Sequence, residues 1–270
     1  MIINSRTVTL NKDILNELVN QDYDSITKTI EDFLKNQISE TSSKGVIVGL
    51  SGGLDSSVIT FLCSRVFKKN MLALIMPDTK ISPKSDTEDA LKIVDSLGIE
   101  YKLLDIGLIV SEYSKYIEPN ERALGNLRAR IRANLLYYYA NVRNYLVVGS
   151  SDKSEFLIGY FTKFGDGSAD SLPIVSLYKT QVRELAKFLG VPKSVIEKKS
   201  SPHLWKNHLA EEEIGASYAE IDSILYCMYD KKLSIDEVIK KTNIERNIVE
   251  KIHERYKNSK HKRITAARPQ

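Results

Sequence analysis

The chain has 270 residues, of which 42% are hydrophobic and 27% charged, and its formal net charge is +4. This composition excludes a disordered chain, and the small, dispersed charge does not indicate nucleic-acid binding. No apolar run approaches the roughly 20 residues of a membrane helix, so we expect a protein that binds no membrane. Residues 1–19 lack a signal-peptide pattern, and the two cysteines (Cys63 and Cys227) form no disulfide framework. We therefore expect a cytoplasmic protein.

Strand and helix patterns alternate as far as residue 149. The predicted elements, in chain order, are helix 22–42, strand 45–50, helix 55–69, strand 71–76, helix 85–97, strand 99–106, helix 120–141, strand 145–149 and helices 178–190, 217–229, 234–240 and 244–258. The strands are short apolar runs, and the helices carry apolar residues three or four positions apart. The alternation predicts an α/β fold with a doubly wound parallel sheet, helices on both faces and a helical C-terminal part. We expect residues 1–270 to form a single domain.

Two segments show little periodicity. Residues 150–177 are rich in glycine and polar side chains, and residues 199–215 are polar and contain the only tryptophan. Long irregular segments often carry binding or catalytic residues. We interpret 199–215 as a loop over a site, with a plain connection as the alternative.

More than half of the 13 glycines fall in two clusters. They are Gly49, Gly52 and Gly53 in the first, and Gly149, Gly159, Gly165 and Gly167 in the second. Glycine is used where the backbone takes a positive φ or closely approaches another group. We therefore expect the two clusters to face one ligand.

Residues 49–56 (Gly-Leu-Ser-Gly-Gly-Leu-Asp-Ser) join the first predicted strand to its helix. Ligands of open α/β sheets bind at the carboxyl ends of the strands. The glycines let backbone N–H groups turn inward, the serines add hydroxyl donors, and a helix N-terminus favours an anion. Asp55 would repel phosphate unless a divalent cation lay between them, so it predicts Mg²⁺. The alternative is a tight turn with a Ser or Asp helix cap, but the complete run favours phosphate binding.

These residues carry a family resemblance. Residues 51–56 resemble the pyrophosphate loop of the ATP pyrophosphatase superfamily. Residues 149–155 and 159–167 resemble the NAD synthetases of that superfamily, and so do the Arg-rich segment 126–132 and residues 261–263. The resemblance covers about residues 22–265. It implies an adenine-nucleotide alpha-hydrolase-like fold and the ATP-dependent amidation of deamido-NAD through an adenylate, which gives NAD, AMP and pyrophosphate.

The resemblance also implies a set of site residues. Mg²⁺ is expected at Asp55 and Glu155. ATP, the co-substrate, is expected at Gly49, Leu50, Ser51, Gly52, Gly53, Leu54, Asp55, Ser56, Ser150, Lys179 and Ser201. Deamido-NAD is expected at Arg130, Lys163, Asp170, His261 and Lys262. The two catalytic candidates are Lys179, which would contact an ATP phosphate, and Asp170, which would orient ammonia or accept a proton from it.

The resemblance further implies a homodimer, with helices 22–42 and 120–141 as candidates for its interface. The chain has no room for a glutaminase domain, and neither cysteine lies in a nucleophile-like context, so we expect direct use of ammonia. Two alternatives stay open. One is another ATP pyrophosphatase, such as a GMP synthetase core or a tRNA-modifying thiolase, although a thiolase normally carries paired cysteines. The other is a nucleotide sensor without turnover.

Overall fold

The sheet is the centre of the computed structural model, which describes residues 11–202, 204–205 and 208–264. Its four strands are β1 (Gly45–Gly49), β2 (Met71–Ile75), β3 (Glu100–Leu103) and β4 (Tyr145–Val148). They lie in the order β3-β2-β1-β4, and every pair is parallel, with Val48 opposite both Ala73 and Val148. The predicted parallel sheet is confirmed.

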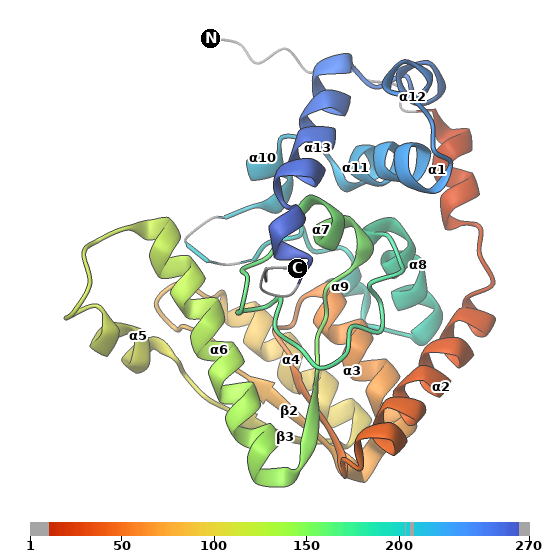
Figure 1. The fold of residues 1–270 in the computed structure, drawn as a ribbon. Helices are drawn as coiled ribbons and strands as arrows, with labels where there is room; N and C mark the ends of the chain where they lie inside the picture. The colour runs from red at the N-terminus through yellow and green to blue at the C-terminus, as the bar shows by residue number, and fades with distance from the viewer. Residues whose placement is uncertain (1–10, 203, 206–207, 265–270) are drawn as a thin grey trace, which may run out of the picture.

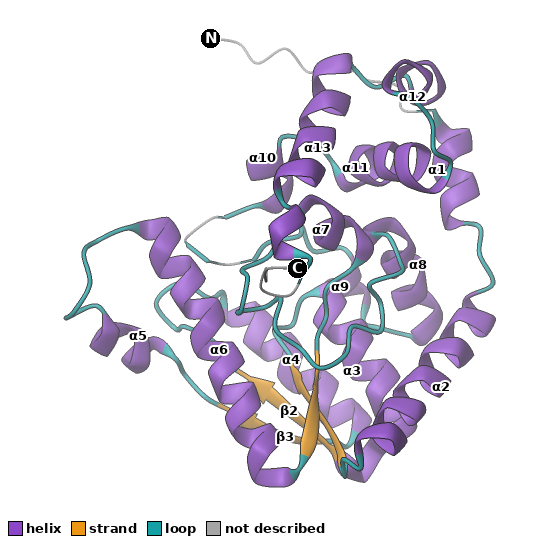
Figure 2. Ribbon diagram, in the orientation of Figure 1, coloured by secondary structure: helices purple, strands orange, loops and turns teal. Residues whose placement is uncertain are grey.

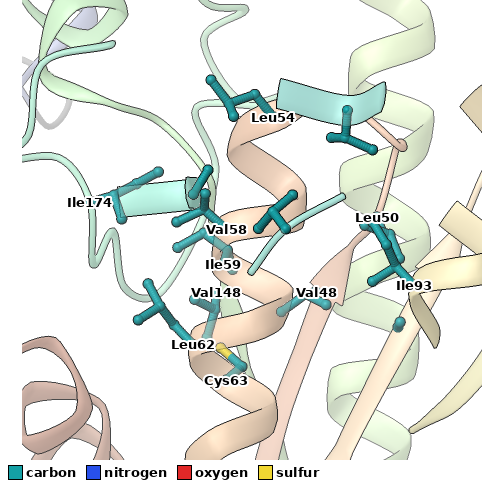
Figure 3. Close-up of a cluster of buried hydrophobic side chains, with 14 of the residues drawn as sticks. Val48, Leu50, Leu54, Val58, Ile59, Leu62, Cys63, Ile93, Val148 and Ile174 are labelled. Atoms are coloured by element: carbon teal, nitrogen blue, oxygen red, sulfur yellow. The ribbon is translucent and has the colours of Figure 1, made fainter. Parts of the chain in front are cut away.

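Helices cover both faces of this sheet (Figures 1 and 2). One face packs against α2 (Tyr23–Thr41), α3 (Leu54–Phe67), α4 (Lys84–Leu97) and α8 (Lys179–Leu189), and the other against α5 (Gly107–Tyr113) and α6 (Glu121–Arg143). Side chains alternate along each strand, so Val46 and Val48 point to the first face while Ile47 points to the second. Figure 3 shows Val48, Leu62 and Ile93 in the first of these cores. The doubly wound arrangement is therefore confirmed.

A third apolar core lies among helices at the carboxyl end of the sheet (Figure 1). Its helices are α1 (Lys12–Val19), α7 (Lys153–Ile158), α10 (Ala210–Ile214), α11 (Tyr218–Leu225), α12 (Ile235–Thr242) and α13 (Arg246–Asn258). The remaining short elements are α9 (Lys193–Ile196), a π-helical turn (Tyr226–Asp230) and 3-10 turns at Lys68–Asn70 and Lys260–Lys262. No helix among the described residues is long and apolar enough to cross a membrane.

The sequence missed several short elements. Helices α1, α5, α7, α9 and α10 were not predicted, and the prediction that 199–215 is irregular throughout is wrong for 210–214, which form α10. Helices this short bury too few residues to show a clear period. The third strand ends at Leu103 rather than at 106, although Leu104 and Ile106 still donate backbone hydrogen bonds to Ile75 and Pro77.

Candidate active site

A cavity of about 730 Å³ lies where the strands end and the C-terminal helices begin. Both glycine clusters contribute to its lining, through Gly49, Gly53, Gly149, Gly159 and Gly165. A cavity of this size accommodates a nucleotide-sized ligand. The prediction that the two clusters face the same space is confirmed, and the identity of the ligand stays a prediction.

The loop after β1 is open to this cavity. Its lining residues are Gly49, Leu50, Ser51, Gly53, Leu54, Asp55 and Ser56. Gly53 is the N-cap of α3, and no side-chain hydrogen bond caps this helix end. The Gly53 N–H donates to Ser51 Oγ at 3.2 Å. Ser56 Oγ accepts a hydrogen bond from the Ser51 N–H at 3.2 Å. These hydrogen bonds hold the Ser51 and Ser56 hydroxyls together at a helix N-terminus, which is an arrangement that suits a phosphate.

Gly52 shapes the backbone of this loop and does not line the cavity. Its φ is +78°, and a Cβ at this position would lie 2.0 Å from the backbone oxygen of Asp86 in α4. Both facts require glycine here. Gly52 therefore sets the path of the loop and lets α4 approach it closely.

Three carboxylates meet at one lysine beside the loop. Lys179 Nζ lies 2.6 Å from Asp55 Oδ2, 2.7 Å from Asp152 Oδ2 and 2.8 Å from Glu155 Oε1. Asp55 lies in the first turn of α3, Asp152 is the N-cap of α7 and Glu155 lies in the first turn of α7, so the ends of β1 and β4 bring them together. One oxygen from each carboxylate lies within 4.8 Å of the others.

This acidic cluster has a formal charge of −2, because three carboxylates surround one ammonium. Burial disfavours the ammonium, but Asp152, Asp55 and Glu155 outweigh that effect and raise the pKa of Lys179 well above its usual value. Asp55 Oδ1 is buried and accepts no hydrogen bond from the described residues. Carboxylate oxygens are the ligands that Mg²⁺ prefers, so the cluster fits a divalent cation in charge, donor type and free acceptor.

Lys179 itself is 1% exposed and does not line the cavity. In this structure its ammonium is turned toward the three carboxylates rather than toward the space that would hold a phosphate. A buried ammonium needs anionic partners, and this cluster supplies three. The expected contact between Lys179 and ATP stays a prediction.

The other predicted residues divide into two sets. Ser150, Glu155, Ser201, His261 and Lys262 line the cavity. Arg130, Lys163 and Asp170 lie outside its lining, although two of them contact residues near it. Arg130 Nη2 donates to the Lys163 carbonyl at 3.3 Å, and Lys163 Nζ donates to the His261 carbonyl at 2.8 Å.

Asp170 is exposed and held at both oxygens. Its Oδ2 accepts from the Val147 N–H at 2.8 Å and its Oδ1 from the Tyr137 hydroxyl at 3.2 Å. Val147 lines the cavity, so Asp170 is hydrogen-bonded to a residue of the cavity lining. Its predicted role toward ammonia stays a prediction.

The C-terminal residues close the far end of α7. Lys262 Nζ donates to the carbonyls of Gly159 and Phe161, both at 2.7 Å, and Arg263 donates to the carbonyl of Leu157. These are the carbonyls that a helix leaves unpaired at and beyond its end. Residues 261–263 are thus an ordered part of the site wall, and not the free basic tail that a chain end usually forms.

Sequence reasoning missed Asp152 and Tyr218 as members of the acidic cluster. Asp152 is fully buried, and its Oδ1 accepts from the Glu155 N–H at 2.8 Å. Tyr218 comes from α11 and donates its hydroxyl to Glu155 Oε1 at 2.8 Å. The Asp-x-x-Glu spacing at 152–155 is a helix-start signal that could have identified Asp152. No local pattern marks Tyr218, because α11 lies far along the chain.

A second polar group borders the cavity. The Glu213 carboxylate accepts from the Tyr160 hydroxyl at 2.7 Å and pairs with His208 Nε2 at 2.7 Å, and the Trp205 ring stacks on the His208 ring with 3.5 Å between centroids. All four side chains line the cavity. Part of the predicted loop 199–215 therefore lies against the site, as expected, and residues 203 and 206–207 fall outside the described residues.

Comparisons with known proteins bear on this site. A family model described as NAD synthase matches residues 26–266. The NH(3)-dependent NAD(+) synthetases of Staphylothermus marinus and Hyperthermus butylicus are 48% and 47% identical to this chain, and each alignment covers 94% of both proteins. The NMN synthetase from Francisella tularensis is similar in structure, with a TM-score of 0.82 and 32% identity over 93% of this chain and 99% of that one. The NH3-dependent NAD synthetase from Campylobacter jejuni, solved with a nitrate ion, has a TM-score of 0.79 and 33% identity over 93% of this chain and 100% of that one.

Proposed function

The chain belongs to the NAD synthase family, and we propose that it forms NAD from deamido-NAD, ATP and ammonia. The observation that carries the proposal is the meeting of Asp55 and Glu155 at one ammonium beside an open, glycine-rich loop. The similarity to curated NH(3)-dependent NAD(+) synthetases over almost their whole length supports it.

The reaction begins at a carboxylate, which is a poor electrophile because it is negatively charged and has no good leaving group. An oxygen of the nicotinate carboxylate attacks the α-phosphorus of ATP, and the bond to the β-phosphate oxygen breaks. The products are a mixed anhydride, the deamido-NAD adenylate, and pyrophosphate. Ammonia then attacks the carbonyl carbon, AMP leaves with the electron pair, and the attacking nitrogen loses a proton. The protein's task is to gather anions and position them.

The loop at 49–56 would bind the polyphosphate of ATP. Ser51 and Ser56 would supply hydroxyls, Gly53 holds the Ser51 hydroxyl through its N–H, and α3 presents its N-terminus. Ser150 and Ser201 line the same cavity and would contact the nucleotide. Lys179 would hold the carboxylates of the cluster in place, and it would contact a phosphate when its ammonium turns from them.

Asp55 and Glu155 would hold Mg²⁺, with Asp152 as a third carboxylate of the same cluster. A bound Mg²⁺ would neutralise the charge that develops on the leaving pyrophosphate. Asp152 fixes the geometry of the other two, since it accepts the Glu155 N–H and pairs with Lys179. Tyr218 donates to Glu155 and restricts its rotation in the same way.

Deamido-NAD would bind at the opposite wall. Arg130, Lys163, His261 and Lys262 form a basic group joined by hydrogen bonds between α6, the 159–167 segment and the C-terminal turn. Such a group favours a dinucleotide pyrophosphate and a carboxylate. Asp170 would orient ammonia or accept its proton beside the adenylate.

A homodimer and a cytoplasmic location belong to the same proposal. Tyr138 and Val142 on α6 are 62% and 65% exposed, and Phe33 on α2 is 39% exposed, so both predicted interface helices present apolar side chains to the surface.

Both cysteines are free and buried, which suits a reducing compartment and leaves no exposed thiol to release ammonia from glutamine.

One assay tests the function and its alternatives. Purified protein is incubated with ATP, Mg²⁺, ammonium and deamido-NAD, and NAD, AMP and pyrophosphate are measured. We expect the three products in equal amounts. Parallel reactions replace deamido-NAD by nicotinate mononucleotide, because one similar structure is an NMN synthetase, or by XMP. Turnover with XMP alone would assign a GMP synthetase, and ATP binding without AMP release would assign a nucleotide sensor.

A further inference from the structure

Lys198 joins three parts of the site that are distant in sequence. It lies between α9 and the 199–209 segment that borders the cavity, and it lines the cavity itself. Its ammonium lies 2.7 Å from Asp86 Oδ1 and 2.7 Å from Asp89 Oδ2, both on α4, and donates to the Gly52 carbonyl at 3.0 Å. An ammonium has three protons to donate, and these three acceptors match them.

The contact with Gly52 fixes one peptide of the loop. The Gly52 carbonyl and the Gly53 N–H belong to the same trans peptide, so they point in opposite directions. With the carbonyl held by Lys198, the Gly53 N–H points to Ser51 Oγ, and both Ser51 and Gly53 line the cavity. A cation on a carbonyl also polarises the peptide and strengthens its N–H as a donor.

The contact with α4 neutralises charge near the same loop. The side chains of Asp86 and Asp89 are only 12% and 10% exposed, and Asp86 lines the cavity. Two such carboxylates would repel a polyphosphate, and a positive group between them removes much of that repulsion. Lys92 also pairs with Asp89, at 3.4 Å, but its side chain is 71% exposed.

We propose that Lys198 is a positioning residue for the loop: its ammonium fixes the peptide between Gly52 and Gly53, whose N–H holds the Ser51 hydroxyl at the cavity where a polyphosphate would bind, and it screens that anion from Asp86 and Asp89. The inference rests on the proposed function, since it needs the loop to bind the phosphates of ATP. It assigns a role to a residue that lines the cavity and is no member of the acidic cluster. Because Lys198 acts through the loop, its loss affects ATP far more than deamido-NAD.

The test compares Lys198→Met with Lys92→Met, which removes the second lysine near Asp89 but no contact to the loop. Binding of MgATP, inorganic pyrophosphate and deamido-NAD is measured by calorimetry without ammonium, and thermal unfolding is recorded for each variant. We expect Lys198→Met to weaken MgATP and pyrophosphate by about tenfold to a hundredfold, as for a lost hydrogen bond to a charged group. Deamido-NAD affinity should stay within about twofold, and Lys92→Met should resemble the wild type for all three ligands.

Lys198→Arg and Lys198→Gln keep the test decisive if the methionine variant does not fold. Arginine keeps a charged donor and should restore most of the MgATP affinity, and glutamine keeps a donor without the charge and should restore less. Unchanged MgATP binding in Lys198→Met or Lys198→Gln, or an equal loss of deamido-NAD binding, would overturn the inference. A wild-type protein that binds neither MgATP nor pyrophosphate would instead overturn the proposed function.

Discussion

Lys179 Nζ lies 2.6 Å from Asp55 Oδ2, across 124 positions of the sequence. The lysine begins α8 and the aspartate lies in the first turn of α3, two helices packed side by side on one face of the sheet. Their contact brings a buried positive charge to the end of the glycine-rich loop at residues 49–56. A cation that binds Asp55 must therefore share this carboxylate with Lys179.

Loss of the ammonium should destabilise the protein and make it respond to metal. Lys179→Met leaves three carboxylates without their counter-charge, and we expect a loss of about 3 to 5 kcal/mol in the free energy of unfolding. Mg²⁺ can supply the missing charge, so it should raise the unfolding temperature of this variant more than that of the wild type. Lys187→Met, which removes an exposed ion pair with Glu184, is the control. Equal Mg²⁺ effects in Lys179→Met and the wild type would contradict this account.

Loss of the Asp55 charge should abolish turnover and leave the fold intact. We expect Asp55→Asn to lower the rate of AMP formation at least about a hundredfold, because a metal ligand contributes several kcal/mol to the transition state. The measurement is AMP release at limiting Mg²⁺, with circular dichroism as the check on folding. Asp32→Asn, at an exposed position on α2, should behave like the wild type. Near-normal activity of Asp55→Asn at limiting Mg²⁺ would show that this carboxylate binds no essential metal.

Asp170 should matter for the second half of the reaction. We expect Asp170→Asn to bind MgATP within about twofold of the wild type and to form NAD about tenfold to a hundredfold more slowly, as for a lost general base. Calorimetry with MgATP and an NAD assay separate the two effects. Tyr137→Phe removes only the hydroxyl that donates to Asp170 Oδ1, so its effect on NAD formation should be smaller. A collapse of MgATP affinity in Asp170→Asn would place this residue in the ATP site instead.

Gly52 and Gly190 share a φ of +78°, but their surroundings differ. An added Cβ meets the Asp86 oxygen at 2.0 Å in Gly52 and nothing within 4 Å in Gly190. Gly190→Ala should cost about 1 to 2 kcal/mol for the left-handed backbone alone. Gly52→Ala should cost more, and should also weaken MgATP binding because the loop must shift. Urea unfolding and calorimetry check both effects, and equal stability losses would mean that α4 moves aside without cost.

Asp222 should make stability depend on pH. It is fully buried, and burial raises its pKa to about 6, although hydrogen bonds from Ser154 and Thr180 act in the opposite direction. Between its ordinary value of 3.8 and about 6, the folded chain keeps a proton at Asp222 that the unfolded chain releases. The stability of the wild type relative to Asp222→Asn should therefore fall as the pH rises through this window, by up to about 3 kcal/mol, and stay constant above it. Urea unfolding between pH 4 and pH 7 measures this difference, and a flat profile would contradict the shift.

Much of the architecture could be predicted because it depends on local patterns. The buried strands and long amphipathic helices show their periods directly, and the run at 49–56 combines a strand, a glycine turn and a helix start. The position of Lys179 could not be predicted in this way. Its contacts with Asp55 and Glu155 follow from the packing of α8 against α3 and α7, which no spacing in the sequence encodes.

The same limit explains what was missed in the site. Asp152 has a local signal, but Tyr218 and Lys198 reach the site only through tertiary contacts. In the sequence, the neighbouring lysines at 198 and 199 are typical of a solvated surface pair. Only the structure shows which groups accept hydrogen bonds from the Lys198 ammonium. Family resemblance identified residues of the cavity lining such as Ser150, Ser201 and His261, whereas Tyr218 and Lys198 needed the structure.

The contacts of Lys262 and Arg263 with the end of α7 bear on how the protein is made. Residues 262 and 263 are synthesised long after α7, whose N-cap is Asp152 and whose first turn holds Glu155. During synthesis this short helix therefore has no support at its far end until residues 262 and 263 have emerged from the ribosome. A chain that terminates before them should hold Asp152 and Glu155 less firmly in the arrangement that the full chain shows.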